Sequence, residues 1–300
     1  MNRTCRLGAK IIFLVLVLPV LLLSGLLLSG QSLAETSVWK ISNNKTSLYL
    51  GGTIHMLSKS DFPLPDAFQR AFNNSDILVL ETNIDETKTE AFQNKITRNM
   101  MYANGKTLKD VIDEQTFLKL QTFLNKRGIA VENVIQLKPS MVSIMLSVVE
   151  IKRIGMTEQG VDNYFFSMAK NKGMRIKFLE TIDEQLSFLF AMGEGNENEL
   201  ISKTLRDLEQ LEVTMRQIKL AWREGNEKKL ANITIKEMLD EYPALYSDLL
   251  VKRNNNWLPN IEKMLQSEET EIILVGAMHL LGKKGLLQQL RNKGYNIEQL

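Results

Sequence analysis

The sequence predicts a mixed α/β fold, with a central β-sheet flanked by helices and a helical insertion before the last strands. Two observations predict it. Short apolar runs of four or five residues alternate along the chain with longer amphipathic stretches, which is typical of buried strands connected by helices. The segment from about 184 to 250 interrupts this alternation, because it is charged and helical in pattern almost throughout.

The first 34 residues have the order of a secretory signal peptide. A basic head precedes an almost unbroken apolar stretch at 11–28, and the small residues at 32–34 would place cleavage before Glu35. Because the apolar stretch approaches the ~20 residues that span a bilayer, an uncleaved anchor in the inner membrane is the alternative. In either case we expect residues 35–300 to form one exported domain. It would be periplasmic or secreted after cleavage, and it would touch the membrane only through the N-terminal segment if that segment is uncleaved.

The charge balance becomes nearly neutral once the signal segment is removed. The chain has 37 basic and 35 acidic residues, and loss of Arg3, Arg6 and Lys10 leaves 34 basic against 35 acidic. With no basic stripe to neutralise phosphates, we do not expect nucleic acid as a partner. The one cysteine, Cys5, also lies in this segment, so the mature chain would have no disulfide, thiolate nucleophile or thiolate metal ligand.

Four predicted strands each lead to a side chain that can do chemistry. The strands are expected at 47–50, 77–80, 176–179 and 271–275, and the side chains that follow them are His55, Glu81, Glu180 and His279. In α/β sheets, ligands bind beyond the carboxyl ends of the strands. We therefore expect these four side chains to lie at one edge of the sheet.

Helices are predicted between these strands and after them. Pro65 and Asp66 open a helix that ends near residues 73–74, with proline at a favoured first position. The other expected helices are 108–126 (one or two), 141–154, 161–172 and 286–292, and a short final strand is expected at 295–297. The segment 184–250, broken at 193–195, 225–226 and Pro243, is expected to be a helical subdomain packed over the active edge of the sheet.

The chain has two histidines, and each is the last residue of a Gly-x-x-His motif that follows a strand, at 52–55 and 276–279. Imidazole is the commonest metal ligand near neutral pH and also the usual general base. Two histidines with one or two carboxylates would form a tetrahedral site with an open water position. The alternative is that both are ordinary core or surface histidines and that Glu81 and Glu180 cap the helices that follow them.

Other candidate residues have two interpretations. Arg253 beside its run of asparagines could be a solvated helix face, or its guanidinium could bind a substrate carboxylate or a developing oxyanion. Trp222 and Trp257 are interpreted as core residues. Asp162 is interpreted as the N-cap of the helix that follows it.

Taken together, several motifs suggest a family. They are Gly-Gly-Thr-Ile-His (51–55), Ile-Leu-Val-Leu-Glu (77–81), Gly-Val-Asp (160–162), Leu-Glu-Thr-x-x-x-Gln (179–185), Arg-Asn (253–254) and Val-Gly-Ala-Met-His-Leu (275–280). In this order and at these intervals, the chain from about Trp39 to its end resembles the TraB/GumN family, which is related to the Tiki metalloproteases of animal cells.

The resemblance implies a Tiki/TraB-like domain with a metal-dependent hydrolytic site. His55 and His279 match the histidines of the paired motifs, Glu81 matches the acid after the second strand, and Arg253 matches the arginine of the Arg-Asn motif. Glu180 matches a recurrent position of bacterial members, with either a chemical or a structural role.

The resulting hypothesis is an exported, metal-dependent hydrolase of peptidase type, acting on a peptide or other small-molecule substrate. His55, His279, Glu81 and Glu180 are the candidate ligands of a divalent ion, which could be manganese, cobalt or zinc. Glu81 and Arg253 are the candidate catalytic residues, with Glu81 either a ligand or the general base. Two alternatives stay open: a non-catalytic protein of the cell envelope that binds or sequesters a peptide or other ligand, and a structural accessory protein of exopolysaccharide export.

Overall fold

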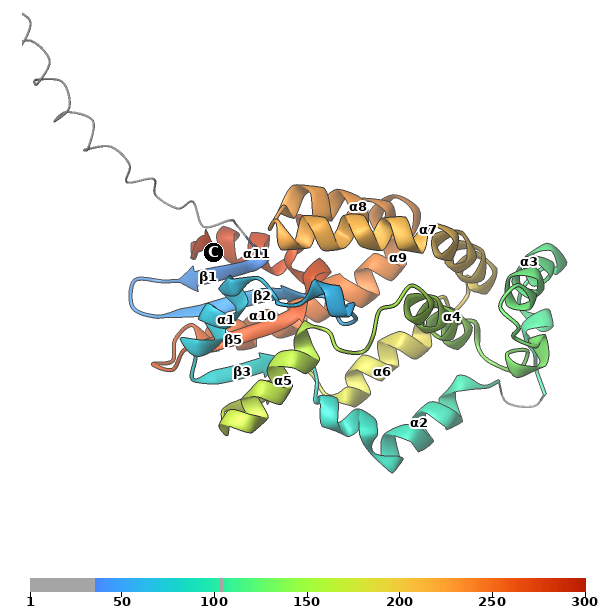
Figure 1. The fold of residues 1–300 in the computed structure, drawn as a ribbon, viewed down its shortest axis with the longest axis horizontal. Helices are drawn as coiled ribbons and strands as arrows, with labels where there is room; N and C mark the ends of the chain where they lie inside the picture. The colour runs from blue at the N-terminus through green and yellow to red at the C-terminus, as the bar shows by residue number, and fades with distance from the viewer. Residues whose placement is uncertain (1–35, 103–104) are drawn as a thin grey trace, which may run out of the picture. The chain divides into compact units, whose positions relative to one another are not determined.

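The computed structural model describes residues 36–102 and 105–300 (Figure 1). The expected signal peptide at 1–34, including Cys5, lies outside the described residues. Among the helices that are described, none is both long enough and apolar enough to cross a membrane.

A single mixed sheet of six strands forms the centre of the described chain, in the order β4-β3-β5-β2-β1-β6. The strands are β1 (Val38–Ser42), β2 (Ser47–Thr53), β3 (Ile77–Leu80), β4 (Arg175–Phe178), β5 (Glu271–Gly276) and β6 (Asn296–Gln299). β2, β5, β3 and β4 run parallel to one another, whereas β1 pairs antiparallel with both β2 and β6. The predicted mixed α/β fold is confirmed, and β1 is a strand that the sequence analysis did not predict.

Helices connect the strands and form most of the rest of the chain. The α-helices are α1 (Asp66–Asn73), α2 (Glu90–Met100), α3 (Glu114–Asn125), α4 (Pro139–Arg153), α5 (Val161–Lys172), α6 (Ile182–Ala191), α7 (Glu197–Arg223), α8 (Glu227–Glu241), α9 (Pro243–Tyr246), α10 (Lys252–Met264) and α11 (Leu286–Asn292). Short 3-10 turns are η1 (Lys59–Asp61), η2 (Ile84–Lys88), η3 (Leu108–Asp110), η4 (Val131–Asn133) and η6 (Ala277–Leu280), and a π-helical turn, η5 (Ser247–Val251), joins α9 to α10. The segment 184–250 is helical, as its pattern predicts, and α2 is a helix that was not predicted.

β3 is apolar and buried at all four positions, Ile77–Leu80, because helices cover both faces of the sheet there. Along β3, Leu78 and Leu80 belong to one core cluster, with residues of α1, α5 and α8. Ile77 and Val79 belong to the other cluster, with residues of α10 and α11. Trp222 and Trp257 are buried in these two clusters, which confirms their interpretation as core residues.

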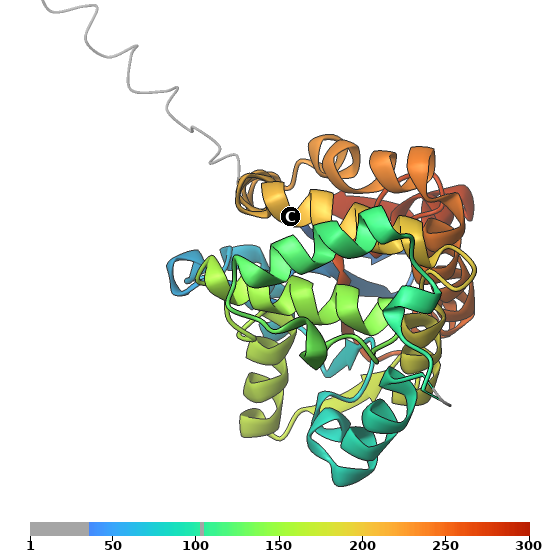
Figure 2. The same ribbon diagram turned by 90° about the vertical axis from the view of Figure 1, so that its right-hand side faces the viewer.

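A third apolar cluster is formed by helices alone, from η3, α3, α4 and the first half of α7. The 27 residues of α7 make it about 40 Å long, so it reaches from this cluster to the core under the sheet, where Trp222 packs. Figure 1 shows α4, α6 and α9 on the side toward which the parallel strands point. In Figure 2 the green helices cross in front of the strands, so helices surround the edge where the predicted site residues lie.

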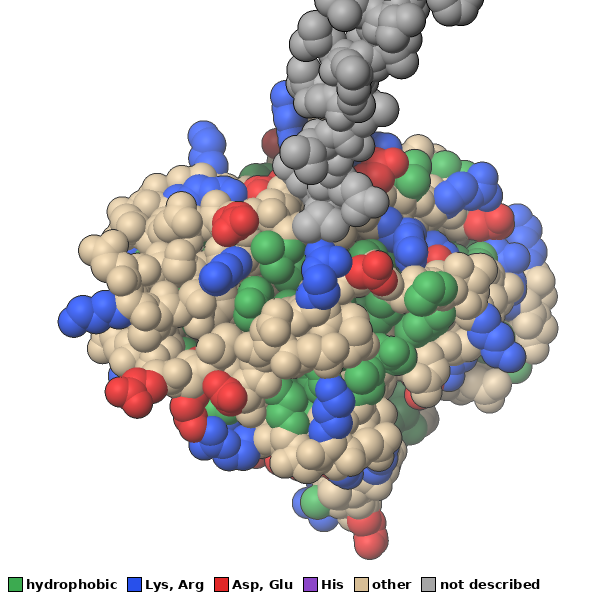
Figure 3. Space-filling model, turned by 60° about the vertical axis from the view of Figure 1, so that its left-hand side comes forward, with side chains coloured by type: hydrophobic (Ala, Val, Ile, Leu, Met, Phe, Trp, Pro, Cys, Tyr) green, Lys and Arg blue, Asp and Glu red, His purple; other side chains and the backbone are tan. Residues whose placement is uncertain are grey.

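The surface carries both signs of charge. On the face of the described residues shown in Figure 3, lysine and arginine side chains are interspersed with those of aspartate and glutamate.

Candidate active site

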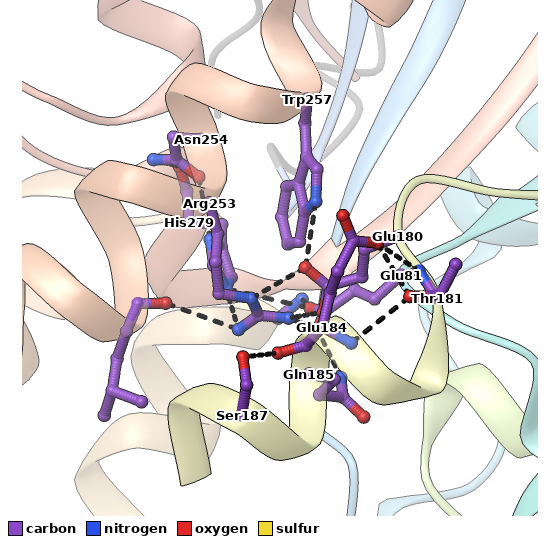
Figure 4. A network of polar contacts seen from close by, with 12 residues as sticks. Glu81, Glu180, Thr181, Glu184, Gln185, Ser187, Arg253, Asn254, Trp257 and His279 are labelled. Carbon is purple, nitrogen blue, oxygen red and sulfur yellow. Dashed lines mark hydrogen bonds and ion pairs between the residues drawn. The ribbon is translucent and has the colours of Figure 1, made fainter. Parts of the chain in front are cut away.

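The sheet brings four predicted side chains to one edge. β2, β5, β3 and β4 are consecutive and parallel, and they lead in that order to His55, His279, Glu81 and Glu180. Arg253 reaches the same place from the first turn of α10 (Figure 4). All five candidate residues therefore lie around one site, although they are spread over about two hundred residues of sequence.

The guanidinium of Arg253 is the centre of this network, and the residue is only 8 % exposed. Its Nε and Nη2 atoms donate to the two oxygens of Glu180, at 3.1 and 2.7 Å, and Nη2 also donates to Glu81 Oε2 at 2.6 Å. Nη1 donates to His279 Nε2 at 3.0 Å and to the carbonyl of Leu249 at 3.3 Å. Arg253 is thus not a solvated helix residue but a buried cation that joins two carboxylates and an imidazole.

Glu180 is fully engaged by its neighbours. Besides the paired bonds from Arg253, its Oε2 accepts a hydrogen bond from the indole Nε1 of Trp257 at 3.1 Å. Burial raises the pKa of Glu180 although Arg253 opposes that rise. The helix-cap alternative for Glu180 is wrong, because α6 is capped by Thr181 together with Glu184.

His279 is buried and held in one tautomer by Asn254. Its Nδ1 lies 2.7 Å from Asn254 Oδ1, while the amide nitrogen of Asn254 donates to the carbonyls of His279 and Lys284. This network assigns the acceptor oxygen of Asn254 to the imidazole, so Nδ1 carries the proton and Nε2 keeps its lone pair. Burial lowers the pKa of His279 to about 3, so the ring is neutral at physiological pH. The Trp257 ring packs beside it, with 4.4 Å between the ring centroids.

His55 is oriented in the same way by Asp162. Its Nδ1 donates to Asp162 Oδ2 at 2.8 Å, and Thr53 Oγ1 donates to Asp162 Oδ1 at 2.9 Å. The Asp162 carboxylate raises the pKa of His55 to about 9. The His55 side chain is 62 % exposed and lines the cavity at this edge. In both histidines, then, an oxygen acceptor fixes Nδ1, which is the arrangement usual for metal-binding imidazoles.

The interpretation of Asp162 as an N-cap is wrong. Gly160 is the N-cap residue of α5, and Asp162 lies inside the first turn with its carboxylate turned toward His55. A glycine is required at 160 because the Cβ of any other residue would lie 2.1 Å from the carbonyl oxygen of His55. This close approach of α5 to the loop after β2 is what brings Asp162 to the imidazole.

Glu81 lies between the two histidines. Its Oε1 accepts from the backbone N–H of Gly276 at 2.7 Å, and lies 3.9 Å from His279 Nε2. Burial opposes its ionisation, but the imidazole of His279, which becomes positive only at low pH, and the positive charges of Arg253 and His55 outweigh burial and lower the pKa of Glu81 to about 2. Glu81 is therefore an ionised carboxylate, and it does not cap a helix.

Gly276 faces the space that these side chains share. A Cβ added to Gly276 would lie 3.4 Å from both Glu81 Oε1 and His55 Nε2, and 3.7 Å from a ring carbon of His279. One small group at this position would thus touch three of the predicted site residues. The side chains of His55, Glu81 and His279 therefore converge on one position in the described part of the chain.

The donor types fit a divalent metal ion, although no complete ligand group is present. Two imidazoles and one carboxylate suit manganese, cobalt or zinc. Two atoms bound to one ion at ~2.1 Å can be up to about 4.2 Å apart, so the 3.9 Å between His279 Nε2 and Glu81 Oε1 is compatible. Within residues 36–102 and 105–300, however, no three His, Cys, Asp or Glu side chains lie close enough to hold an ion as they stand. Arg253 accounts for part of this, because its Nη1 occupies the lone pair of His279 Nε2.

A cavity of about 370 Å³ opens over the site. Its lining combines polar residues, which include His55, Glu81, Asp162, Gln185 and Arg253, with apolar ones. Its size is at the lower end of the roughly 300–1,000 Å³ range of small-molecule sites.

Comparisons with known proteins show the family to which the chain belongs. A family model described as the TraB/PrgY/gumN family matches residues 37–299. Protein YbaP of Escherichia coli (strain K12) is 24 % identical over 248 residues, which cover 81 % of this chain and 87 % of YbaP. YbaP of Shigella flexneri matches to the same extent.

A more distant relative carries a named activity. Metalloprotease TIKI1 of Danio rerio is 22 % identical over 87 % of this chain and 62 % of its own length. No solved structure matches the chain.

Proposed function

The chain belongs to the TraB/PrgY/gumN family, and from this membership together with the site at the strand ends we propose that it is an exported, metal-dependent hydrolase of peptidase type. One observation carries the proposal. The ring of His55, the ring of His279 and the carboxylate of Glu81 surround the same small space at Gly276, and each imidazole is oriented through its Nδ1. The similarity to metalloprotease TIKI1 supports the reaction class.

In this proposal His55, His279 and Glu81 hold the ion, which is manganese, cobalt or zinc. The bound ion would lower the pKa of water and polarise the carbonyl of the substrate. Asp162 and Asn254 keep the two Nε2 atoms directed into the site, since each accepts a hydrogen bond from the Nδ1–H group of one imidazole. For His279 to become a ligand, Nη1 of Arg253 has to leave its Nε2 atom.

Arg253 supplies the fixed positive charge of the site. Its guanidinium lies in a buried place, where a cation stabilises negative charge on a substrate oxygen more strongly than in water. Glu180 positions it, because both Glu180 oxygens are already taken by Arg253 and Trp257. Glu81 is ionised and can accept a proton from the attacking water.

The export part of the proposal rests on the order of basic, apolar and small residues in the first 34 positions. The substrate would then be a peptide or small molecule of the periplasm or the cell exterior. A chain that retains its first 34 residues would stay attached to the inner membrane.

A non-catalytic ligand-binding protein is the second candidate, favoured by one observation. The charged groups of the site already compensate one another, with Arg253 bound to Glu81 and Glu180, and His55 bound to Asp162. Such a site could hold a peptide or other ligand without an ion.

Replacing Glu81 by glutamine separates these candidates. In the hydrolase, Glu81→Gln removes a ligand or base and lowers peptide hydrolysis at least ~100-fold, while circular dichroism shows an unchanged fold. The matched control is Glu86→Gln, which changes an exposed carboxylate of η2 and leaves hydrolysis unchanged. A purified protein that hydrolyses no peptide with manganese, cobalt or zinc, yet binds one through Glu81, would support the second candidate.

A further inference from the structure

The cavity at the strand ends has an apolar wall that the proposed chemistry does not use. It is formed by Ile84 of η2, Phe188 and Leu189 of α6, and Leu249 of the π-helical turn η5. These three elements are far apart in sequence, and each contributes at least one side chain to the lining of the cavity.

Two of these side chains are not part of the hydrophobic core. Phe188 and Leu189 belong to none of the three core clusters of the described residues, although both are half-buried. Ile84 and Leu249 pack only on the margin of the cluster under the sheet. Apolar side chains that line an open cavity without supporting the core are typical of a ligand-binding wall.

The charges around the cavity disfavour a charged occupant. Its lining contains one arginine and no lysine, and that arginine is bound to Glu81 and Glu180. The second acid of the lining, Asp162, is bound to His55. A charged substrate side chain at the wall would therefore lose its hydration without gaining a free partner.

We propose that Ile84, Phe188, Leu189 and Leu249 form a side-chain subsite for an aliphatic or aromatic residue next to the bond that is cleaved. This rests on the proposed hydrolase function for the reaction, but the binding preference follows from the wall itself. The cavity of about 370 Å³ has room for one or two residues of an extended peptide, not for a folded protein.

The test uses short fluorescent peptides that differ at one position, with leucine, aspartate or lysine between glycines. Binding to the chelator-treated full chain is measured by fluorescence anisotropy, and hydrolysis with added manganese, cobalt or zinc is followed by mass spectrometry. We expect the leucine peptide to bind at least about tenfold more tightly than the aspartate or lysine peptide. Where cleavage occurs, we expect it at a bond of the leucine residue.

Phe188→Ala and Leu189→Ala should each reduce the leucine preference at least about threefold. The matched control is Phe190→Ala, which removes the same ring two residues further along α6, where the side chain is also half-buried but does not line the cavity. This control should keep the preference of the parent chain. Circular dichroism of all three variants checks that α6 still folds.

The outcomes separate the subsite from the enzyme. A leucine preference without hydrolysis supports the subsite and contradicts the hydrolase. Hydrolysis without any preference keeps the hydrolase and overturns the subsite. Equal binding of the peptides, no binding of any peptide, or an equal loss in Phe190→Ala and Phe188→Ala also overturns the subsite.

Discussion

Replacement of Gly276 by alanine should inactivate the protein without destabilising it. The backbone at Gly276 has φ −49° and ψ 132°, which alanine adopts without strain. The added methyl group would lie 3.4 Å from Glu81 Oε1 and from His55 Nε2, which is ordinary van der Waals contact, so it fits the protein as it stands. It fills the space among the three side chains that would hold the ion.

The substitution should affect stability and activity in opposite directions. Glycine-to-alanine changes at compatible positions stabilise by about 0.4–1 kcal/mol, through the unfolded chain. A displacement of reacting groups by about 1 Å costs roughly 100-fold in rate. We therefore expect urea denaturation to show equal or slightly greater stability, and peptide hydrolysis to fall about 100-fold together with metal affinity.

The assay pairs urea unfolding with metal titration and peptide hydrolysis on the same preparation. Full metal affinity and full activity in Gly276→Ala would refute the placement of the site among His55, Glu81 and His279. A loss of stability by several kcal/mol would instead refute the inference that alanine fits the backbone conformation and the space at position 276.

Four further predictions concern the groups around the site. In metal-free protein the two histidine Cε1–H signals in proton NMR should titrate near pH 3 for His279 and near pH 9 for His55, and Asp162→Asn should move the second toward 6.5. Because the folded-state pKa of His55 is raised, its pairing with Asp162 stabilises the fold fully below about pH 6.5, and this stabilisation is lost as pH rises through about 9. The His55 side chain is 62 % exposed, so the loss of stability measured by urea unfolding should be small. The same loss should be absent in Asp162→Asn. Asn254→Ala leaves the His279 Nδ1 proton and two carbonyls without a partner and should lower the free energy of unfolding by about 3 kcal/mol, whereas an unchanged urea midpoint would contradict the network. Arg253→Lys keeps the charge but loses the paired donors to the carboxylates, so kcat should fall roughly 100-fold, and a fall below threefold would show that the guanidinium geometry is not used.

The strands and their order along the chain could be predicted because buried parallel strands leave a simple signal. Ile77–Leu80 and Glu271–Gly276 are almost continuously apolar, and Glu81 marks the end of the first run and Gly276 the end of the second. β1 was missed since it is only five residues long, contains Lys40 and directly follows the expected signal segment. α2 was not predicted although Phe92, Ile96 and Met100 recur at the helical spacing of four residues; none of its residues is buried.

The site could be predicted as a set of residues but not as a network. The position after a parallel strand predicts that His55, Glu81, Glu180 and His279 share an edge, and the structure brings them together. No pattern of local spacing shows that Arg253 pairs with both glutamates, since this depends on how α10 packs against the sheet.

Asp162 shows the limit of local rules most clearly. An acidic residue two positions after a glycine at a helix start reads as a cap, but the close approach of Gly160 to the His55 carbonyl turns its carboxylate to the imidazole. The Gly-Val-Asp motif contains this information, because its glycine is required where the chain approaches the His55 carbonyl. That requirement can be recognised only in the three-dimensional structure.

Calorimetric titration of the chelator-treated protein with manganese, cobalt and zinc, followed in parallel with peptide hydrolysis, tests whether the site binds an ion and uses it for hydrolysis. We expect one ion to bind per chain, hydrolysis to appear in proportion to the ion bound, and both to be lost in His279→Ala. Protein that binds none of the three ions in a fixed ratio and cleaves no peptide in their presence would show that the proposed function is wrong.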